Sequence, residues 1–139
     1  MRFMMIVKAT KESEASVMPS EKLMSEMQKY HEELQKAGVL LDASGLKPSS
    51  KGWRVKYSGA KRTVIDGPFT ESKELIAGYT IIQVKSREEA MEWARRFPNP
   101  SIDGGAAEIE VRQFFELEDF GPSEAVERFR EMEKGLKKK

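Results

Sequence analysis

The sequence predicts a single α+β domain whose strands and helices follow the order βαββαβ. Residues 20–37 carry apolar side chains at spacings of three and four, which is typical of a helix with one apolar face, and Gly38 follows as a helix-ending residue. Residues 86–97 show the same kind of spacing and end before Pro98. Short apolar runs bounded by Gly, Pro and Ser predict the strands. The 139 residues are enough for one independent core.

The apolar runs differ in how many faces they can bury. Residues 3–7 are apolar on both faces, whereas residues 53–57 alternate between apolar and basic side chains, as expected of a strand with one wet face. The other predicted strands span residues 39–46, 63–65, 78–84 and 109–115. With the hairpin of residues 53–65 set aside, the order is that of a ferredoxin-like domain with an antiparallel sheet. Residues 11–18, which are polar and small, are expected to form a loop.

Local signals define the second helix and a C-terminal extension. Ser86 and Glu89 match a capping box, in which the hydroxyl and the carboxylate each accept a hydrogen bond from a free backbone donor. The segment Gly121–Ser123 starts a third helix. We therefore expect a core domain over residues 1–116 and a helical extension over residues 117–139, which ends in a solvated run of lysines.

The predicted sheet has helices on one face only, although several of its strands are apolar on both faces. Burying one Val or Leu side chain is worth about 1.5–3 kcal/mol, and a small domain is stable by only about 5–15 kcal/mol in total. A wet apolar face would therefore cost more stability than the domain can lose. The simplest cover is the sheet of a second copy, so we predict a homodimer.

Composition excludes several classes of site. The chain has no cysteine and one histidine, so a disulfide framework and a thiolate site are excluded, and a zinc site, which usually needs three or four N or S ligands, is not expected. The formal net charge of +1 gives no electrostatic reason to expect binding to nucleic acid or to a membrane. No run approaches the roughly 18 apolar residues of a membrane helix, and the apolar start is too short for a signal peptide. We expect a cytoplasmic protein without a metal or other cofactor.

The most specific motif is the run Asp66–Glu74, which lies between two predicted strands. Its Asp-Gly-Pro-Phe start suits neither a helix nor a strand, because Gly is flexible and Pro lacks a backbone donor. The run resembles, almost letter for letter, the motif of the DGPF group of the YCII-related family. Weaker matches to that family lie at residues 3–8, 37–40, 45–46, 77–79, 89–94 and 109–112.

The resemblance covers residues 1 to about 115 and implies the dimeric α+β barrel, in which two ferredoxin-like sheets face each other. Families with this fold include cofactor-free oxygenases, muconolactone isomerase-like enzymes and haem peroxidases. The resemblance implies no particular reaction, because fold does not determine function. It also implies a regulatory context, since DGPF proteins are often encoded beside alternative sigma factors.

Asp66 is the first candidate for a functional residue. A carboxylate half shielded by Pro68 and Phe69 is suited to act as a general base or hydrogen-bond acceptor. The alternative is that Asp66 closes a turn by accepting backbone N–H bonds, with Gly67 supplying an unusual backbone angle. A His–Asp catalytic pair has been proposed for some members of the resembled family, in branches other than the DGPF group. His31, the only histidine, is the second candidate because from the first helix it could face the cleft. It lies at the edge of the first helix's apolar stripe, where the alternative is a boundary residue bonded to solvent.

The leading interpretation is a small-molecule cleft bordered by the Asp66 loop, the first helix and the sheet, with cofactor-independent acid–base chemistry. Its predicted lining comprises Gly67, Pro68, Phe69, Tyr79 and Trp53. Aromatic residues on strands are otherwise core or dimer-interface residues. The rival interpretation is a non-catalytic module that senses a ligand or binds a protein, such as a sigma-factor-associated regulator, and in a third the motif only forms a turn. The sequence does not decide whether the protein is an enzyme.

Overall fold

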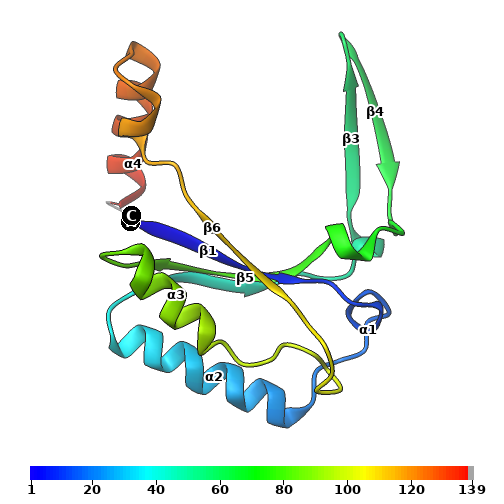
Figure 1. Cartoon of the computed structure of the whole chain (residues 1–139). Coiled ribbons are helices and arrows are strands. Elements are labelled where there is room, and N and C mark those ends of the chain that lie inside the picture. The colour runs from blue at the N-terminus through cyan, green and yellow to red at the C-terminus, as the bar shows by residue number, and fades with distance from the viewer. Residues whose placement is uncertain (138–139) are drawn as a thin grey trace.

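The structure, a computed structural model, describes residues 1–137 and contains an antiparallel sheet with two long helices on one face (Figure 1). The four strands of this sheet lie in the order β2-β5-β1-β6. Their bounds are Arg2–Lys8 for β1, Leu40–Gly45 for β2, Ile76–Gln83 for β5 and Ile109–Gln113 for β6. The two helices are α2, Glu21–Lys36, and α3, Arg87–Arg95. This order confirms the predicted α+β, ferredoxin-like chain.

The remaining elements connect or extend this core. Strands β3, Trp53–Ser58, and β4, Lys61–Asp66, pair as a hairpin. The expected C-terminal helix is present as α4, Glu124–Lys137. The short helical elements are α1, Lys11–Glu14, and the 3-10 turns η1, Ser49–Lys51, η2, Ser72–Glu74, and η3, Leu117–Phe120. Of the predicted lysine tail, Lys138 and Lys139 lie outside the described residues.

Helix α1 lies where the sequence predicts a loop. The Thr10 hydroxyl accepts a hydrogen bond from Ser13 N at 3.2 Å, and the Ser13 hydroxyl accepts one from Thr10 N at 2.8 Å. This reciprocal capping satisfies two backbone donors that a short helix would otherwise leave free. The signal is weak in the sequence, because Ser13 takes the place of the Glu or Gln that usually closes such a box.

The two long helices begin and end close to the predicted residues. The side chain of Ser20 caps the start of α2, and Gly38 follows its end with a φ of +74°, which glycine adopts at little cost. The Ser86 hydroxyl accepts a hydrogen bond from Glu89 N at 3.1 Å. The Glu89 carboxylate, however, accepts from Lys85 N at 3.0 Å instead of from Ser86 N. The predicted capping box of α3 is therefore only half formed, because the Glu89 carboxylate binds the backbone N–H of the residue before Ser86.

The core lies between the helices and the sheet. The largest of its fully buried side chains are Met5, Leu34, Ile82 and Thr80. Tyr30 of α2 lies in the same layer and donates a hydrogen bond to the Trp93 carbonyl of α3 at 2.6 Å. Burial, more than any neighbouring charge, raises the pKa of Tyr30 far above its ordinary value, so the phenol stays neutral and links the two helices.

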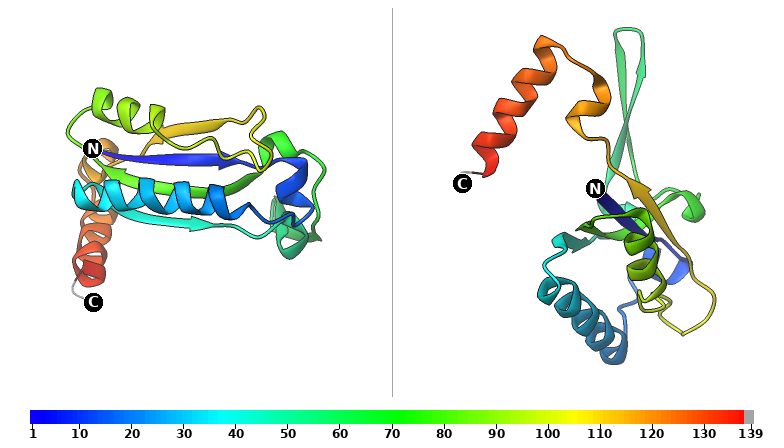
Figure 2. Two further views of the ribbon diagram at one scale, coloured as in Figure 1. Left: turned by 90° about the horizontal axis from the view of Figure 1, so that it is seen from below. Right: turned by 60° about the vertical axis from the view of Figure 1, so that its left-hand side comes forward.

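Among the described residues, no helix packs on the opposite face of the sheet (Figure 1). On β1, Met5 faces the helices, so its neighbours Met4 and Ile6 face the other way. Tyr79 and Ile81 of β5 pair with these two residues and share their face. All four side chains are only half-buried. The β3–β4 hairpin and α4 both rise from this side, at opposite ends of the sheet (Figure 1 and Figure 2). The sheet thus has the one-sided helix cover that the sequence predicts.

We expect Leu34→Ala to lower the free energy of unfolding by about 2–5 kcal/mol, because Leu34 is fully buried between α2 and the sheet. Urea denaturation at a fixed protein concentration measures the change. Met24→Ala is the matched control, since Met24 lies on the same helix and is 57% exposed. Its substitution should change the free energy of unfolding by less than about 0.5 kcal/mol. Equal losses in the two variants would contradict the assigned core.

Candidate functional site

Asp66 is the last residue of β4 and stands at the base of the β3–β4 hairpin. The antiparallel register places it directly opposite Trp53, the first residue of β3. Directly opposed residues share a face of the hairpin, so the carboxylate and the indole are neighbours. Both side chains are exposed. Among the side chains that the structure describes in residues 1–137, which do not include that of Ser72, the Asp66 carboxylate takes part in neither a hydrogen bond nor an ion pair.

Gly67 is fixed by the close approach of two backbone segments. Its N–H donates to the Gly52 carbonyl at 3.0 Å. A Cβ atom built on Gly67 would overlap the carbonyl oxygen of Ser49, so only glycine fits without a shift of the backbone. The φ of Gly67 is not positive, and the peptide bond between Gly67 and Pro68 is cis. Packing against η1, rather than an unusual φ, therefore accounts for the glycine of the motif.

Ser49 connects the motif to the N-terminal part of the chain. Its hydroxyl accepts a hydrogen bond from Phe69 N at 2.9 Å and donates one to a carboxylate oxygen of Glu14. The other carboxylate oxygen of Glu14 accepts from Ser49 N at 2.8 Å. Hydrogen bonds to a charged group are stronger than those between neutral groups. Sequence reasoning missed Glu14 and Ser49, because 35 residues separate them and neither belongs to a repeating pattern.

Arg54 holds the motif from the other face of the hairpin. Alternation along β3 directs its side chain away from the face that Trp53 and Asp66 share. The guanidinium carbon lies 3.8 Å from the centroid of the Phe69 ring, and a guanidinium nitrogen lies 3.7 Å from a carboxylate oxygen of Glu71. The face of an aromatic ring attracts such a cation. Sequence reasoning missed Arg54 as well, although the alternation of β3 indicates which face it occupies.

His31 lies on the helix side of the sheet, whereas the hairpin that carries Asp66 rises from the other side (Figure 1). Its Nδ1 is 2.7 Å from the Met27 carbonyl oxygen, which can only accept, so we assign the proton to Nδ1. In that neutral tautomer Nε2 accepts from the hydroxyl of the fully buried Thr80, 2.8 Å away. His31 thus links α2 to β5. The structure does not bring the two candidate catalytic residues together within one chain.

Tyr79 lies on the open face of the sheet rather than on the hairpin. Its hydroxyl donates to a carboxylate oxygen of Asp42 on β2 at 3.1 Å. The predicted ligand lining is therefore divided between two surfaces, the hairpin base and the open sheet face.

An ion pair joins Lys8 of β1 and Glu110 of β6 at 3.3 Å. The hydrogen bond from Lys8 is the main cause that lowers the pKa of Glu110.

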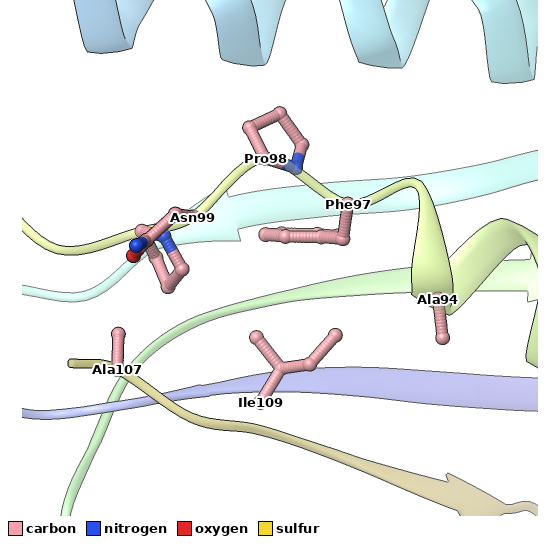
Figure 3. Close-up of a pocket in the computed structure, with 7 residues that line it drawn as sticks. Ala94, Phe97, Pro98, Asn99, Ala107 and Ile109 are labelled. Atoms are coloured by element: carbon pink, nitrogen blue, oxygen red, sulfur yellow. The ribbon is translucent and has the colours of Figure 1, made fainter. Parts of the chain in front are cut away.

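Two shallow hollows lie apart from the predicted site. The one drawn in Figure 3 has a volume of about 230 Å³ and lies between the end of α3 and the start of β6. Phe97, Pro98 and Asn99 border it on one side, and Ala107 and Ile109 border it on the other (Figure 3). The second lies over α2 and the residues that follow α3. No residue of the predicted site lines either hollow, so we place the candidate site at Asp66 by its chemistry.

The chemistry available at Asp66 is that of an exposed carboxylate between an indole and a tightly held turn. Such a group accepts protons and hydrogen bonds and attracts cations. In the part of the chain that the structure describes, no three His, Asp or Glu side chains are grouped as metal ligands. None of the helices in residues 1–137 has the length and apolar character to cross a membrane.

Sequence and structure comparisons identify similar proteins. The family model described as the YCII-related domain matches residues 1–115. An uncharacterised protein of Rhizobium meliloti (strain 1021) is 29% identical over 89 residues, which make up 64% of this chain and 72% of that protein. A solved structure of 5-chloro-2-hydroxyhydroquinone dehydrochlorinase from Burkholderia phenoliruptrix AC1100, in complex with 2,5-dihydroxybenzoquinone, aligns at a TM-score of 0.45 with 14% identity. That alignment covers 83% of this chain and 94% of the dehydrochlorinase.

We expect Gly67→Ala to lower the free energy of unfolding by about 1–3 kcal/mol, because the new Cβ would overlap the Ser49 carbonyl oxygen and force the two segments apart. Urea denaturation measures the loss. Gly52→Ala is the matched control, since its Cβ would lie an ordinary 3.7 Å from the same oxygen. If Gly67→Ala proved as stable as Gly52→Ala, the packing of the motif on η1 would be wrong.

Proposed function

The chain belongs to the YCII-related family, and we propose on that premise that it binds a small organic molecule beside Asp66, at the base of the β3–β4 hairpin. The Asp66 carboxylate accepts a proton or a hydrogen bond from the bound molecule, and the chemistry needs no cofactor. Membership of the DGPF group within the family stays a prediction.

The free carboxylate of Asp66 is the observation that carries this proposal. If the motif served only to close a turn, its carboxylate should accept backbone N–H bonds. Instead the N–H groups of Gly67 and Phe69 donate to Gly52 and Ser49, and the carboxylate stays exposed. A turn that is satisfied by other groups leaves its carboxylate available to a ligand.

The neighbours of Asp66 suit a planar ligand. Trp53 offers an exposed indole on the same face, against which a flat ring can stack. The hydrogen bonds of Ser49 and the cation–π contact of Arg54 hold the backbone beside Asp66 in place, and such positioning is what a general base requires. His31 has no part in this proposal within one chain, because both of its ring nitrogens have partners on the helix side of the sheet.

The homodimer expected from the sequence is part of the same proposal. Met4, Ile6, Tyr79 and Ile81 give the open sheet face an apolar centre that no helix covers. The sheet of a second copy would cover this face and exclude water from Tyr79. Support comes from the one-sided helix layer and from the rise of the hairpin and α4 on the open side (Figure 2).

Sedimentation velocity at micromolar concentration should give twice the mass of one chain. Ile6→Asp places a charge at the centre of the open face and should yield monomer, because an unpaired charge is costly to bury. Met24→Asp is the control, since it puts the same charge on an exposed position of α2 and should leave the mass unchanged. A monomeric wild-type chain would overturn the dimer.

We expect small hydroxylated aromatic compounds to raise the melting temperature of the wild type in a thermal-shift screen, and to lose this effect on Asp66→Asn. A ligand at about 100 times its dissociation constant adds about 2.7 kcal/mol to the folded state, a shift of several degrees. Asp103→Asn, in the loop before β6, is the matched control and should respond as the wild type does. If a compound raised the melting temperature of the wild type and of folded Asp66→Asn equally, Asp66 would be excluded from the site.

A non-catalytic protein-binding module is the second candidate, and the exposed apolar side of α4 favours it. Phe129 and Met132 are both exposed on this helix, as in amphipathic helices that dock into a partner. Under this alternative, compounds that raise the melting temperature in the thermal-shift screen would bind to the protein but would not be chemically converted by it. Deleting the residues after Phe120 would abolish partner binding while leaving the dimer intact.

A further inference from the structure

We infer that Glu14, the last residue of α1, is a positioning residue of the Asp66 site and acts on it through Ser49. The inference deepens the proposed function and rests on it, since a positioning residue needs a site to position. It also states what holds the loop that begins with Asp66, and that statement can be tested without a ligand. The role falls on α1, a helix that lies where the sequence predicts a loop.

Helix α1 lies at the same end of the sheet as the base of the hairpin (Figure 1). Just before the helix, the Ala9 N–H donates to the Leu75 carbonyl at 2.9 Å, directly after η2. The reciprocal hydrogen bonds of Thr10 and Ser13 fix its only turn. A helix of four residues has little stability of its own. These contacts therefore determine where Glu14 lies.

The hydroxyl of Ser49 has one proton, which it donates to a carboxylate oxygen of Glu14. The other oxygen of Glu14 accepts from Ser49 N at 2.8 Å. Because the hydroxyl donates towards Glu14, a lone pair of its oxygen is free to accept from Phe69 N at 2.9 Å. The charged acceptor strengthens this chain of hydrogen bonds, since linked bonds polarise one another. Glu14 thus determines which way the Ser49 hydroxyl points and where the Phe69 amide is held.

The Phe69 amide lies three residues after Asp66. The start of this short segment is fixed by the hairpin register, which places Asp66 opposite Trp53, and by Gly67, whose N–H donates to a backbone carbonyl just before β3 at 3.0 Å. Its end is fixed by the bond of the Phe69 amide. Without Glu14 the end would be loose, and the carboxylate and the indole would lose their fixed relative placement.

Arg54 supports the same loop in a different way. Its ion pair with Glu71 spans 3.7 Å between side chains that are 40% and 50% exposed, and exposed pairs of this kind contribute little. Its other contact is with the ring of Phe69 and does not fix the backbone amide. Glu14 and Ser49 are half-buried and act on that amide itself. The backbone of the loop therefore depends mainly on Glu14.

Amide hydrogen exchange in the isotope-labelled full chain, followed by NMR, tests the inference without a ligand. We expect Glu14→Ala to speed the exchange of the Phe69 amide at least about tenfold, because this amide loses its fixed acceptor. Glu12→Ala is the matched control, since Glu12 lies exposed on the same helix, and should leave the rate unchanged. The amide of Ile82 in β5 reports opening of the core and should be accelerated much less. Equal acceleration of Phe69 and Ile82 would overturn the inference.

Glu14→Gln tests whether the hydrogen bonds to Ser49 carry the effect. The amide oxygen of glutamine can accept from Ser49 N, and its NH₂ group can donate to the hydroxyl oxygen, which keeps a lone pair for the Phe69 N–H. We therefore expect exchange at Phe69 closer to the wild-type rate than to that of Glu14→Ala. In a Ser49→Ala background, Glu14→Ala should add little, because the link is already broken. A full additional effect there, or no rescue by glutamine, would contradict the inference.

The indole N–H resonance of Trp53 reports on the site itself, since Trp53 lies opposite Asp66. Trp93, the only other tryptophan, is half-buried on α3 and serves as the internal reference. We expect Glu14→Ala to move the Trp53 resonance and to leave that of Trp93 in place. A Trp53 resonance that stayed in place would show that Glu14 does not act on the site.

A compound that stabilises the wild type but not Asp66→Asn should bind Glu14→Ala at least about tenfold more weakly, because the loop must then be ordered on binding. Isothermal titration at a temperature where both proteins are folded measures the dissociation constant. A purely structural role of Glu14 would leave this constant unchanged, and that result would overturn the inference. If the screen yields no such compound, the proposed function fails, whereas the exchange rates and the indole resonance still decide whether Glu14 positions the loop.

Discussion

The packing of α2 and α3 on one face of the β1–β5 pair is the contact on which the rest of the molecule depends. It buries Met5, Thr80 and Ile82 and turns their neighbours, among them Ile6 and Tyr79, to the opposite side. Strand alternation leaves no freedom in this division, since a slip by one residue would exchange the two faces. The open face is the direct result of a helix layer that covers one side only.

In the loop that begins with Asp66, the backbone and the Asp66 side chain have separate roles. Its backbone is held by groups from elsewhere: Ser49 binds the Phe69 amide, Gly52 binds the Gly67 amide, and Arg54 lies over the Phe69 ring. The Asp66 side chain takes no part in this support. Rigid support around a free carboxylate is the arrangement that positions a group for a ligand, because little conformational entropy is then lost on binding.

The elements that could be predicted are those whose signals are local and periodic. Each of these signals lies within a short stretch of sequence. Examples are the apolar stripe and the caps of α2, the glycine at position 38 and the alternation of β3. The support of the motif by Glu14 and Ser49 could not be predicted, because it joins segments far apart in the chain. Helical periodicity likewise placed His31 at the edge of a stripe but could not say that it meets Thr80, which is a property of how the helix lies on the sheet.

The contact between Gly67 and Ser49 bears on how such a motif is inherited. The four consecutive residues 66–69 look like a self-contained motif. The need for glycine at position 67, however, comes from the 3-10 turn η1, which precedes the hairpin. The unit is therefore split, with one half around Ser49 and the other from Asp66 to Phe69. Transferring residues 66–69 alone to another protein would therefore transfer the sequence motif without the Ser49 segment against which its glycine packs. Substitutions in the two halves should therefore be correlated among relatives.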